Sequence, residues 1–280
     1  MIVAVLLAGC LALAGCLAFT PPPSGPSSFG TTSSGIVRHG VALPDRGHGF
    51  ERARPGEETR YGTPALIGAL TRAFASVADR FGPGVPMRVG DLSAPYGGRH
   101  PRHGSHRSGL DADVLFFAVD ASGRSRPSRG WLAFNRFGYA IDDGGDASSG
   151  SAALAYYDDA RNWHFARTLL LDEEANVQWL FVSRGVKARL LRWAVDHEPD
   201  PRAIQRAAYA MHQPADASPH DDHFHVRILC ATDELAYGCV NRGPIWPWLR
   251  DVEKPTVVPG DALDDDALIR GLMDPIEGDP

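Results

Sequence analysis

Two short segments contain most of the side chains in this chain that could do chemistry. Residues 103–113 read HGSHRSGLDAD, and residues 220–227 read HDDHFHVR. The first segment contains His106 and Asp113, and the second contains His223 and His225. Neutral imidazole and carboxylate are natural ligands of a divalent ion such as zinc. Three protein ligands leave one coordination position open for water, which is the arrangement of a catalytic rather than a structural zinc site.

Apolar runs follow both segments and predict that the site is built on β-sheet. VLFF follows Asp113, and VRIL follows His225. Side chains alternate along a strand, so His223 and His225 are expected on the same face. One ring can then bind the ion while the other faces the reacting water. Asp111 has the same parity as Asp113, so spacing alone does not choose between the two carboxylates.

The remaining periodicity predicts an α+β fold: one domain over residues 60–250, with helices packed on a central, mainly antiparallel sheet that carries the zinc site. Thr63 and Pro64 predict a helix start, an apolar stripe at helical spacing follows, and Gly82 ends it. Further helices are predicted at 160–171, 186–195 and 201–211, and strands at 85–92, 111–117, 177–182 and 223–229. Residues 118–155 are expected to form a long loop that makes one wall of a substrate cleft.

Composition excludes two classes of partner. The 280 residues are 44% hydrophobic, which is enough for a sizeable core, and the formal net charge is −6. No basic run is present, so neither nucleic acid nor an anionic membrane surface is expected to attract the chain by charge. Contact with a membrane is expected only through a lipid anchor.

The N-terminus predicts export. Residues 1–20 carry no charged side chain and contain Leu-Ala-Gly-Cys twice, ending at Cys10 and Cys16. This tetrad resembles a bacterial lipoprotein processing site, so residues 1–16 are expected to be a signal peptide and Cys16 the lipidated first residue. An ordinary secretory peptide or a membrane anchor is the alternative. Residues 17–59, rich in Pro, Ser and Gly, are expected to be a flexible tether, and 251–280 an acidic tail.

Two cysteines remain outside the expected signal peptide. Cys230 and Cys239 flank a polar segment directly after the second histidine cluster. Export to an oxidising compartment predicts a disulfide between them, with two buried free thiols as the alternative.

The two histidine motifs together resemble those of the penicillin-insensitive murein endopeptidases. SHRSGLDAD at 105–113 and HDDHFHVR at 220–227 carry the resemblance. The wider group comprises lysostaphin-type enzymes, D-Ala-D-Ala metallopeptidases and the hedgehog fold. The resemblance implies Zn2+ as cofactor, with His106, Asp113 and His225 as ligands and His103 as a further candidate. His223 is then the residue for general-base or transition-state work. The best-known branch of the family uses more disulfides than the single one that Cys230 and Cys239 can form here.

The resemblance also implies a substrate and a compartment. The substrate is peptidoglycan, and the reaction is hydrolysis of the amide between D-alanine and the diamino acid of a neighbouring stem. The enzyme is expected in the periplasm, where a lipid on Cys16 is expected to hold it at the outer membrane. His220 and Arg227 are candidate substrate contacts, with a loop histidine and a structural salt bridge as their alternatives. Asn162 and Trp163 also resemble the family, or are packing residues. The rival functions are a carboxypeptidase or amidase acting on another wall bond, and a noncatalytic, zinc-stabilised wall-binding lipoprotein.

Overall fold

A seven-stranded sheet forms the centre of the protein. The computed structural model describes residues 27–82, 84–127, 130–142, 153–250 and 252. In spatial order the strands are β14 (Met211–His212), β13 (Val177–Phe181), β15 (His223–Ile228), β8 (Asp111–Leu115), β7 (Met87–Val89), β5 (Phe50–Arg52) and β4 (Arg46–Gly47). Only the pairs β13–β14 and β5–β7 are parallel, and the other four are antiparallel. The predicted α+β class and mainly antiparallel sheet are therefore confirmed.

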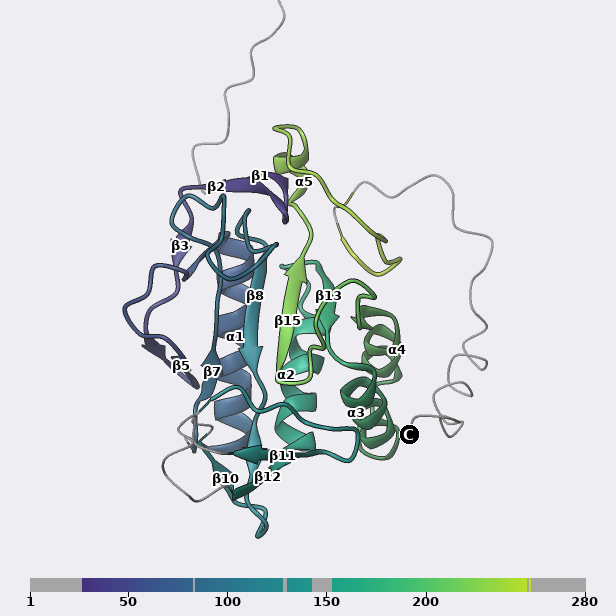
Figure 1. The fold of residues 1–280 in the computed structure, drawn as a ribbon. Helices are drawn as coiled ribbons and strands as arrows, with labels where there is room; N and C mark the ends of the chain where they lie inside the picture. The colour runs from purple at the N-terminus through teal and green to yellow at the C-terminus, as the bar shows by residue number, and fades with distance from the viewer. Residues whose placement is uncertain (1–26, 83, 128–129, 143–152, 251, 253–280) are drawn as a thin grey trace, which may run out of the picture.

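Helices cover the sheet on one side. They are α1 (Pro64–Phe81), α2 (Asp159–Leu171), α3 (Arg184–His197) and α4 (Pro201–Ala210), whereas the short α5 (Thr232–Leu235) lies beside β1. Figure 1 shows α1 and α2 behind β8 and β15, with α3 and α4 beside β13. As predicted, the Thr63 side chain caps α1 by accepting a hydrogen bond from Leu66 N, and Gly82 ends the helix at φ 82°. None of the helices in the described ranges has the length and apolar character needed to span a bilayer.

Strands β8 and β15 have one apolar face and one polar face. The apolar side chains are fully buried and belong to the core: Ala112, Val114, Phe224 and Val226. The Phe224 ring lies 5.6 Å from Phe165 of α2, so this face packs on the helices. Because side chains alternate along a strand, the residues between them must point away from the helices. The alternation therefore places the histidines and aspartates on the uncovered face.

The expected tether at 17–59 is wrong over the residues that the structure describes, 27–59. They form β1 (Ser27–Thr31), β2 (Ser34–Arg38), β3 (Val41–Ala42) and the sheet strands β4 and β5. Leu43 and Phe50 are 0% and 4% exposed and belong to the core. The strands are short, and their partners are distant in sequence: β5 pairs with β7, and β3 with β6 (Tyr61–Gly62). Sparse apolar residues among Gly, Ser and Pro therefore become ordered through long-range pairing.

The expected loop at 118–155 also contains strands. They are β9 (Ala118–Val119), β10 (Ser125–Arg126), β11 (Tyr139–Asp142) and β12 (Ala153–Tyr157), in the sheet order β10-β9-β12-β11. The expected signal peptide with Cys16 lies outside the described residues, as does all of the expected acidic tail except Val252.

Candidate metal centre

The register between β8 and β15 builds the floor of the candidate site. His225 lies directly opposite Asp113, and Arg227 lies directly opposite Asp111. Both carboxylates are 0% exposed, and His225 is 6% exposed. The structure thus brings together the aspartate and histidine that the sequence predicted, on neighbouring strands of the uncovered face.

A loop before β8 supplies further imidazoles. His100, His103 and His106 converge there, and the His103 and His106 ring centroids are 4.4 Å apart. His106 is 0% exposed and has φ 60°, a left-handed conformation that is uncommon for a residue other than glycine. Its backbone N–H donates to Asp111 Oδ2 at 3.1 Å, and this bond holds the conformation. His100, which the motif analysis did not single out, accepts hydrogen bonds from the backbone of 102 and 103 and shapes the turn.

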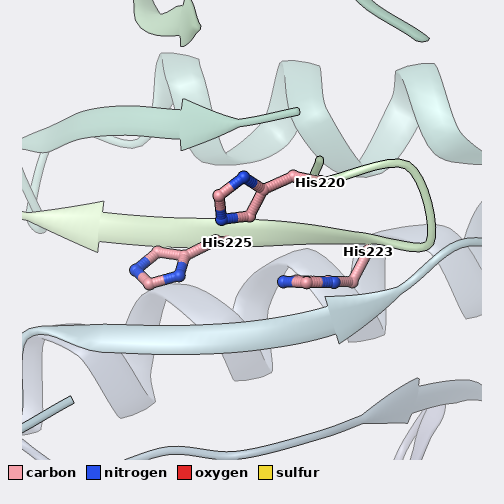
Figure 2. A group of neighbouring side chains, drawn as sticks. All are labelled: His220, His223 and His225. Carbon is pink, nitrogen blue, oxygen red and sulfur yellow. The ribbon is translucent and has the colours of Figure 1, made fainter. Parts of the chain in front are cut away.

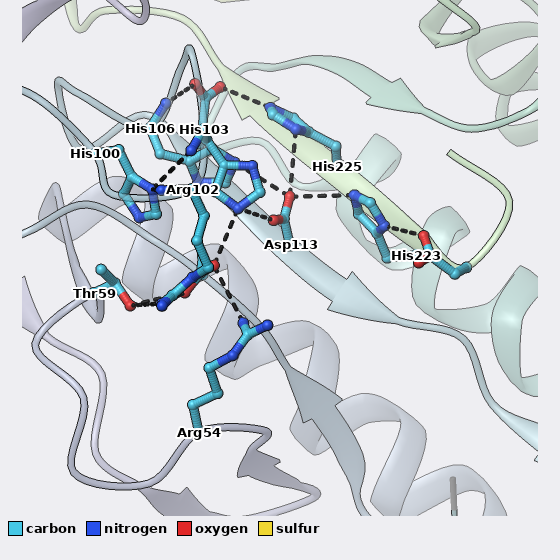
Figure 3. Close-up of polar contacts among 12 residues, drawn as sticks. Arg54, Thr59, His100, Arg102, His103, His106, Asp113, His223 and His225 are labelled. Carbon is cyan, nitrogen blue, oxygen red and sulfur yellow. Dashed lines mark hydrogen bonds and ion pairs between the residues drawn. The ribbon is translucent and has the colours of Figure 1, made fainter. Parts of the chain in front are cut away.

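Four imidazoles surround the Asp113 carboxylate (Figure 3). Its Oδ1 lies 3.2 Å from His106 Nε2, 3.3 Å from His225 Nδ1 and 3.4 Å from His223 Nε2. Its Oδ2 lies 3.4 Å from His103 Nε2. Within the described part of the chain, neither oxygen has a partner in hydrogen-bonding geometry. A buried carboxylate without hydrogen bonds is costly unless a cation neutralises it.

The distances around Asp113 Oδ1 fit an ion bound at that oxygen. Two ligands bonded to one zinc ion at about 2.0–2.1 Å in tetrahedral geometry lie about 3.3–3.4 Å apart. The contacts of Asp113 Oδ1 match that spacing. Ligand atoms of His103, His106 and Asp113 lie within 4.8 Å of one another, as do those of His220, His223 and His225. The donor set of imidazole and carboxylate suits zinc or a related divalent ion.

The pKa values of the two β15 histidines are shifted in opposite directions. Burial lowers the pKa of His225 to about 4, although Asp111 opposes this shift, so the ring is neutral as a ligand must be. Burial would also lower the pKa of His223, but Asp113 and Asp222 together raise it to about 10. The Nδ1 of His223 is 2.5 Å from Asp222 Oδ1. The two carboxylates thus favour a protonated His223 ring, and a cation bound at Asp113 would oppose this shift.

His220 lies over the two β15 histidines (Figure 2). Its ring centroid is 5.2 Å from that of His223 and 5.6 Å from that of His225. Burial, with the neighbouring His225 and His223, lowers the pKa of His220 to about 4. All three rings line a cavity of about 710 Å³, and Trp179, Phe181 and His212 lie on its wall. The predicted position of His220 in the cleft is consistent with this arrangement.

Arg227 and Asn162, two further residues singled out from the sequence, make hydrogen bonds that stabilise the fold. Arg227 also lines the cavity, but its Nε and Nη2 donate to the Asp111 carboxylate at 2.6 and 3.2 Å, which is the salt-bridge alternative. Asp111 is thereby committed to Arg227 and to the backbone of His106. Asn162 is 0% exposed and clamps Phe117 through both backbone groups, so the structure does not bring it into the site.

The predicted disulfide between Cys230 and Cys239 is confirmed. It closes the segment that contains α5, directly after β15. The N-terminal hairpin docks on this segment, since Gly30 N donates to Gly238 O and Val240 N donates to Gly30 O. The disulfide therefore stabilises the end of the site strand and the hairpin together.

Comparison with known proteins agrees with this geometry. Residues 28–247 match the family model described as penicillin-insensitive murein endopeptidase. A relative of that name from Haemophilus influenzae is 28% identical over 227 residues, which cover 78% of this chain and 68% of the relative. The matched region contains both histidine segments and every residue of the cluster around Asp113. The chain belongs to the penicillin-insensitive murein endopeptidase family.

Proposed function

We propose that this protein is a zinc-dependent endopeptidase that hydrolyses peptide cross-bridges of peptidoglycan. The observation that carries the proposal is the Asp113 carboxylate, fully buried and without hydrogen bonds, with four imidazole nitrogens 3.2–3.4 Å from its oxygens. A purely structural ion would not need an additional histidine beside it at the edge of an open cavity. The family supports murein as the substrate.

Each residue has a distinct part in this proposal. His106, Asp113 and His225 hold the ion, and His103 is a further candidate ligand at the mouth of the site. Asp111 Oδ1 lies 3.3 Å from His225 Nε2, the ring nitrogen that does not face Asp113. A contact to the second nitrogen of a ligating histidine fixes the orientation of its ring. When bound, zinc would polarise the scissile carbonyl and lower the pKa of the reacting water.

His223 then moves the proton. Its Nε2 points to the cluster and its Nδ1 is held by Asp222, so the ring presents one defined nitrogen to the substrate. With a cation at Asp113 the ring can be neutral, and it would then accept a proton from the reacting water and pass it to the leaving amine; in its protonated form it would stabilise the developing oxyanion. His220 lies beside it in the cavity, and we propose that it contacts the substrate.

The bond proposed for hydrolysis joins D-alanine to the diamino acid of the neighbouring stem. A murein endopeptidase acts on the cell wall, so a periplasmic or extracellular location fits, and the Cys230–Cys239 disulfide suits an oxidising compartment. We further propose that the chain is held at the outer membrane by a lipid on Cys16.

A purified cross-linked muropeptide dimer tests the proposal. Incubation with the zinc-loaded protein should give two monomers, one of which carries a newly freed amine on its diamino acid. Release of terminal D-alanine alone would show a carboxypeptidase, and separation of the peptide from the glycan would show an amidase. An intact dimer would indicate a noncatalytic protein. Any of these three results would overturn the proposed reaction.

A further inference from the structure

We propose that Asp91, which lies outside both histidine motifs, is a positioning residue that orders two sides of the metal centre. The inference rests on the proposed function, because it concerns how the protein prepares its own ligands for the ion. Asp91 follows β7 in the sequence Gly-Asp-Leu and is 1% exposed. It contacts His103 directly and reaches His223 through Arg54 and Trp131.

The Asp91 carboxylate is fixed by several donors. Arg102 donates to Oδ1 at 2.6 Å through Nη2 and to Oδ2 at 2.8 Å through Nε. Thr59 Oγ1 donates at 2.8 Å and Arg54 Nη1 at 3.2 Å, and Figure 3 shows these side chains converging. Four donor atoms from three side chains therefore hold this carboxylate in one place.

The direct connection runs to His103 and to the backbone of Asp113. The Nε2 of His103 lies 3.0 Å from Asp91 Oδ2 and 3.4 Å from Asp113 Oδ2, so the two carboxylates together set the ring orientation on that side of the cluster. Asp113 N donates to Asp91 O at 2.9 Å, and Gly90 N donates to Asp113 O at 2.8 Å. The Asp91 side chain thus positions His103, and the backbone of residues 90–91 positions Asp113. Such outer contacts typically change metal affinity or activity by about 10–100-fold when they are removed.

The indirect connection runs to His223. The Arg54 guanidinium, held by Asp91, lies 5.3 Å from the centroid of the Trp131 ring. That ring meets the His223 ring edge-to-face, with centroids 5.1 Å apart and planes at 88°. A Cβ at Gly90 would lie 2.6 Å from Trp131 Cη2, so the indole rests directly on the backbone next to Asp91. The indole thus packs directly against the His223 ring, and the Gly90–Asp91 pair fixes its position.

The alternative is that Asp91 only stabilises the fold, as any buried carboxylate paired with arginine does. Asp172 provides a matched control. Its side chain is 6% exposed, and Arg72 donates to it at 2.8 and 2.9 Å. It also accepts hydrogen bonds from the backbone N–H groups of Glu174 and Ala175, at the end of α2. Asp172 has no contact with the cluster, so its loss should lower stability alone.

The experiment measures the zinc dissociation constant by competition with a chromophoric chelator. Asp91→Asn should weaken zinc binding by about 10–100-fold, and Asp172→Asn should leave it within about twofold of wild type at a comparable loss of melting temperature. If Asp91→Asn binds zinc as wild type does, Asp91 is structural and the inference is overturned. If the wild-type protein itself binds no zinc, the proposed function fails as well.

Arg54→Met isolates the indirect connection and keeps the inference testable if Asp91→Asn does not fold. The variant leaves the contact between Asp91 and His103 in place, so the zinc dissociation constant should stay within about twofold of wild type. Turnover should fall at least fivefold with little change in KM, because Trp131 loses its contact with Arg54 and no longer holds the His223 ring in position. Unchanged turnover would overturn the connection through Trp131, and a weakened zinc affinity would show that the two connections are not separate.

Discussion

Replacing His223 and His225 one at a time should separate proton transfer from ion binding. His223→Ala leaves His106 Nε2 and His225 Nδ1 at 3.2 and 3.3 Å from Asp113 Oδ1, so the set of proposed ligands remains complete. What is lost is the ring whose pKa the two carboxylates raise to about 10. General acid–base groups contribute about 10²–10⁴-fold to rate, so turnover should fall by that factor while zinc stays near one equivalent.

His225→Ala should behave differently. The variant removes a nitrogen from the buried cluster and also removes the neighbour of Asp111 at 3.3 Å. Loss of a direct ligand should cost more than the roughly 10–100-fold that outer contacts contribute, so both bound zinc and turnover should disappear. Asp113→Ala should match it. The exposed His48, paired only with Asp79 among the described residues, provides His48→Ala as a control that keeps both properties.

The assay combines zinc content by atomic emission after dialysis with turnover of a cross-linked muropeptide, and circular dichroism confirms that each variant is folded. Loss of zinc in His223→Ala with retention in His225→Ala would invert the two roles. Retention of zinc and activity in both variants would refute the metallopeptidase mechanism itself.

Three further predictions concern stability and processing. Replacing Cys230 and Cys239 by serine should lower the free energy of unfolding by about 2–3 kcal/mol, the chain-entropy value for so short a loop, measured by urea denaturation; no change would contradict the bracing role. Burial would raise the pKa of Glu198, but the hydrogen bond from Trp163 and the ion pair with Arg167 lower this pKa below its usual value. The carboxylate therefore stabilises the folded protein at neutral pH, and this stabilisation is lost as the pH falls below about 4.5. The melting temperature of Glu198→Gln should accordingly lie below that of wild type at pH 7, and the difference should shrink as the pH falls through the lowered pKa of Glu198; a constant difference would contradict the sign. Mass spectrometry of the mature protein should find a lipidated N-terminal Cys16, and an unlipidated start after that position would refute the anchor.

Local signals in the sequence predicted the elements that carry the site. The Thr63–Pro64 start of α1 and the alternation in β15 both act through neighbouring residues, so both are visible in a single sequence. The same alternation predicted that His223 and His225 would share a face, whereas the register that sets His225 opposite Asp113 comes from pairing between distant strands. The cysteine pair was likewise predictable, because export and spacing both favour a disulfide.

Long-range contacts account for what the sequence did not predict. Leu43 and Phe50 are isolated apolar residues in a Gly- and Pro-rich stretch, and only pairing with β6 and β7 orders their strands. Asp91 has no fixed spacing to either histidine motif, and its donors Arg54 and Arg102 come from separate loops. A single aspartate of this kind has no periodicity or motif that would set it apart before the fold is known.

Titration of zinc into metal-free protein tests the central claim most directly. Turnover of a cross-linked muropeptide should be absent without metal, rise in proportion to added zinc and level off near one equivalent. Asp113→Ala, which lacks the buried carboxylate at the centre of the cluster, should stay inactive at every zinc concentration. Full turnover in the metal-free protein, or zinc-dependent turnover in Asp113→Ala, would contradict the account.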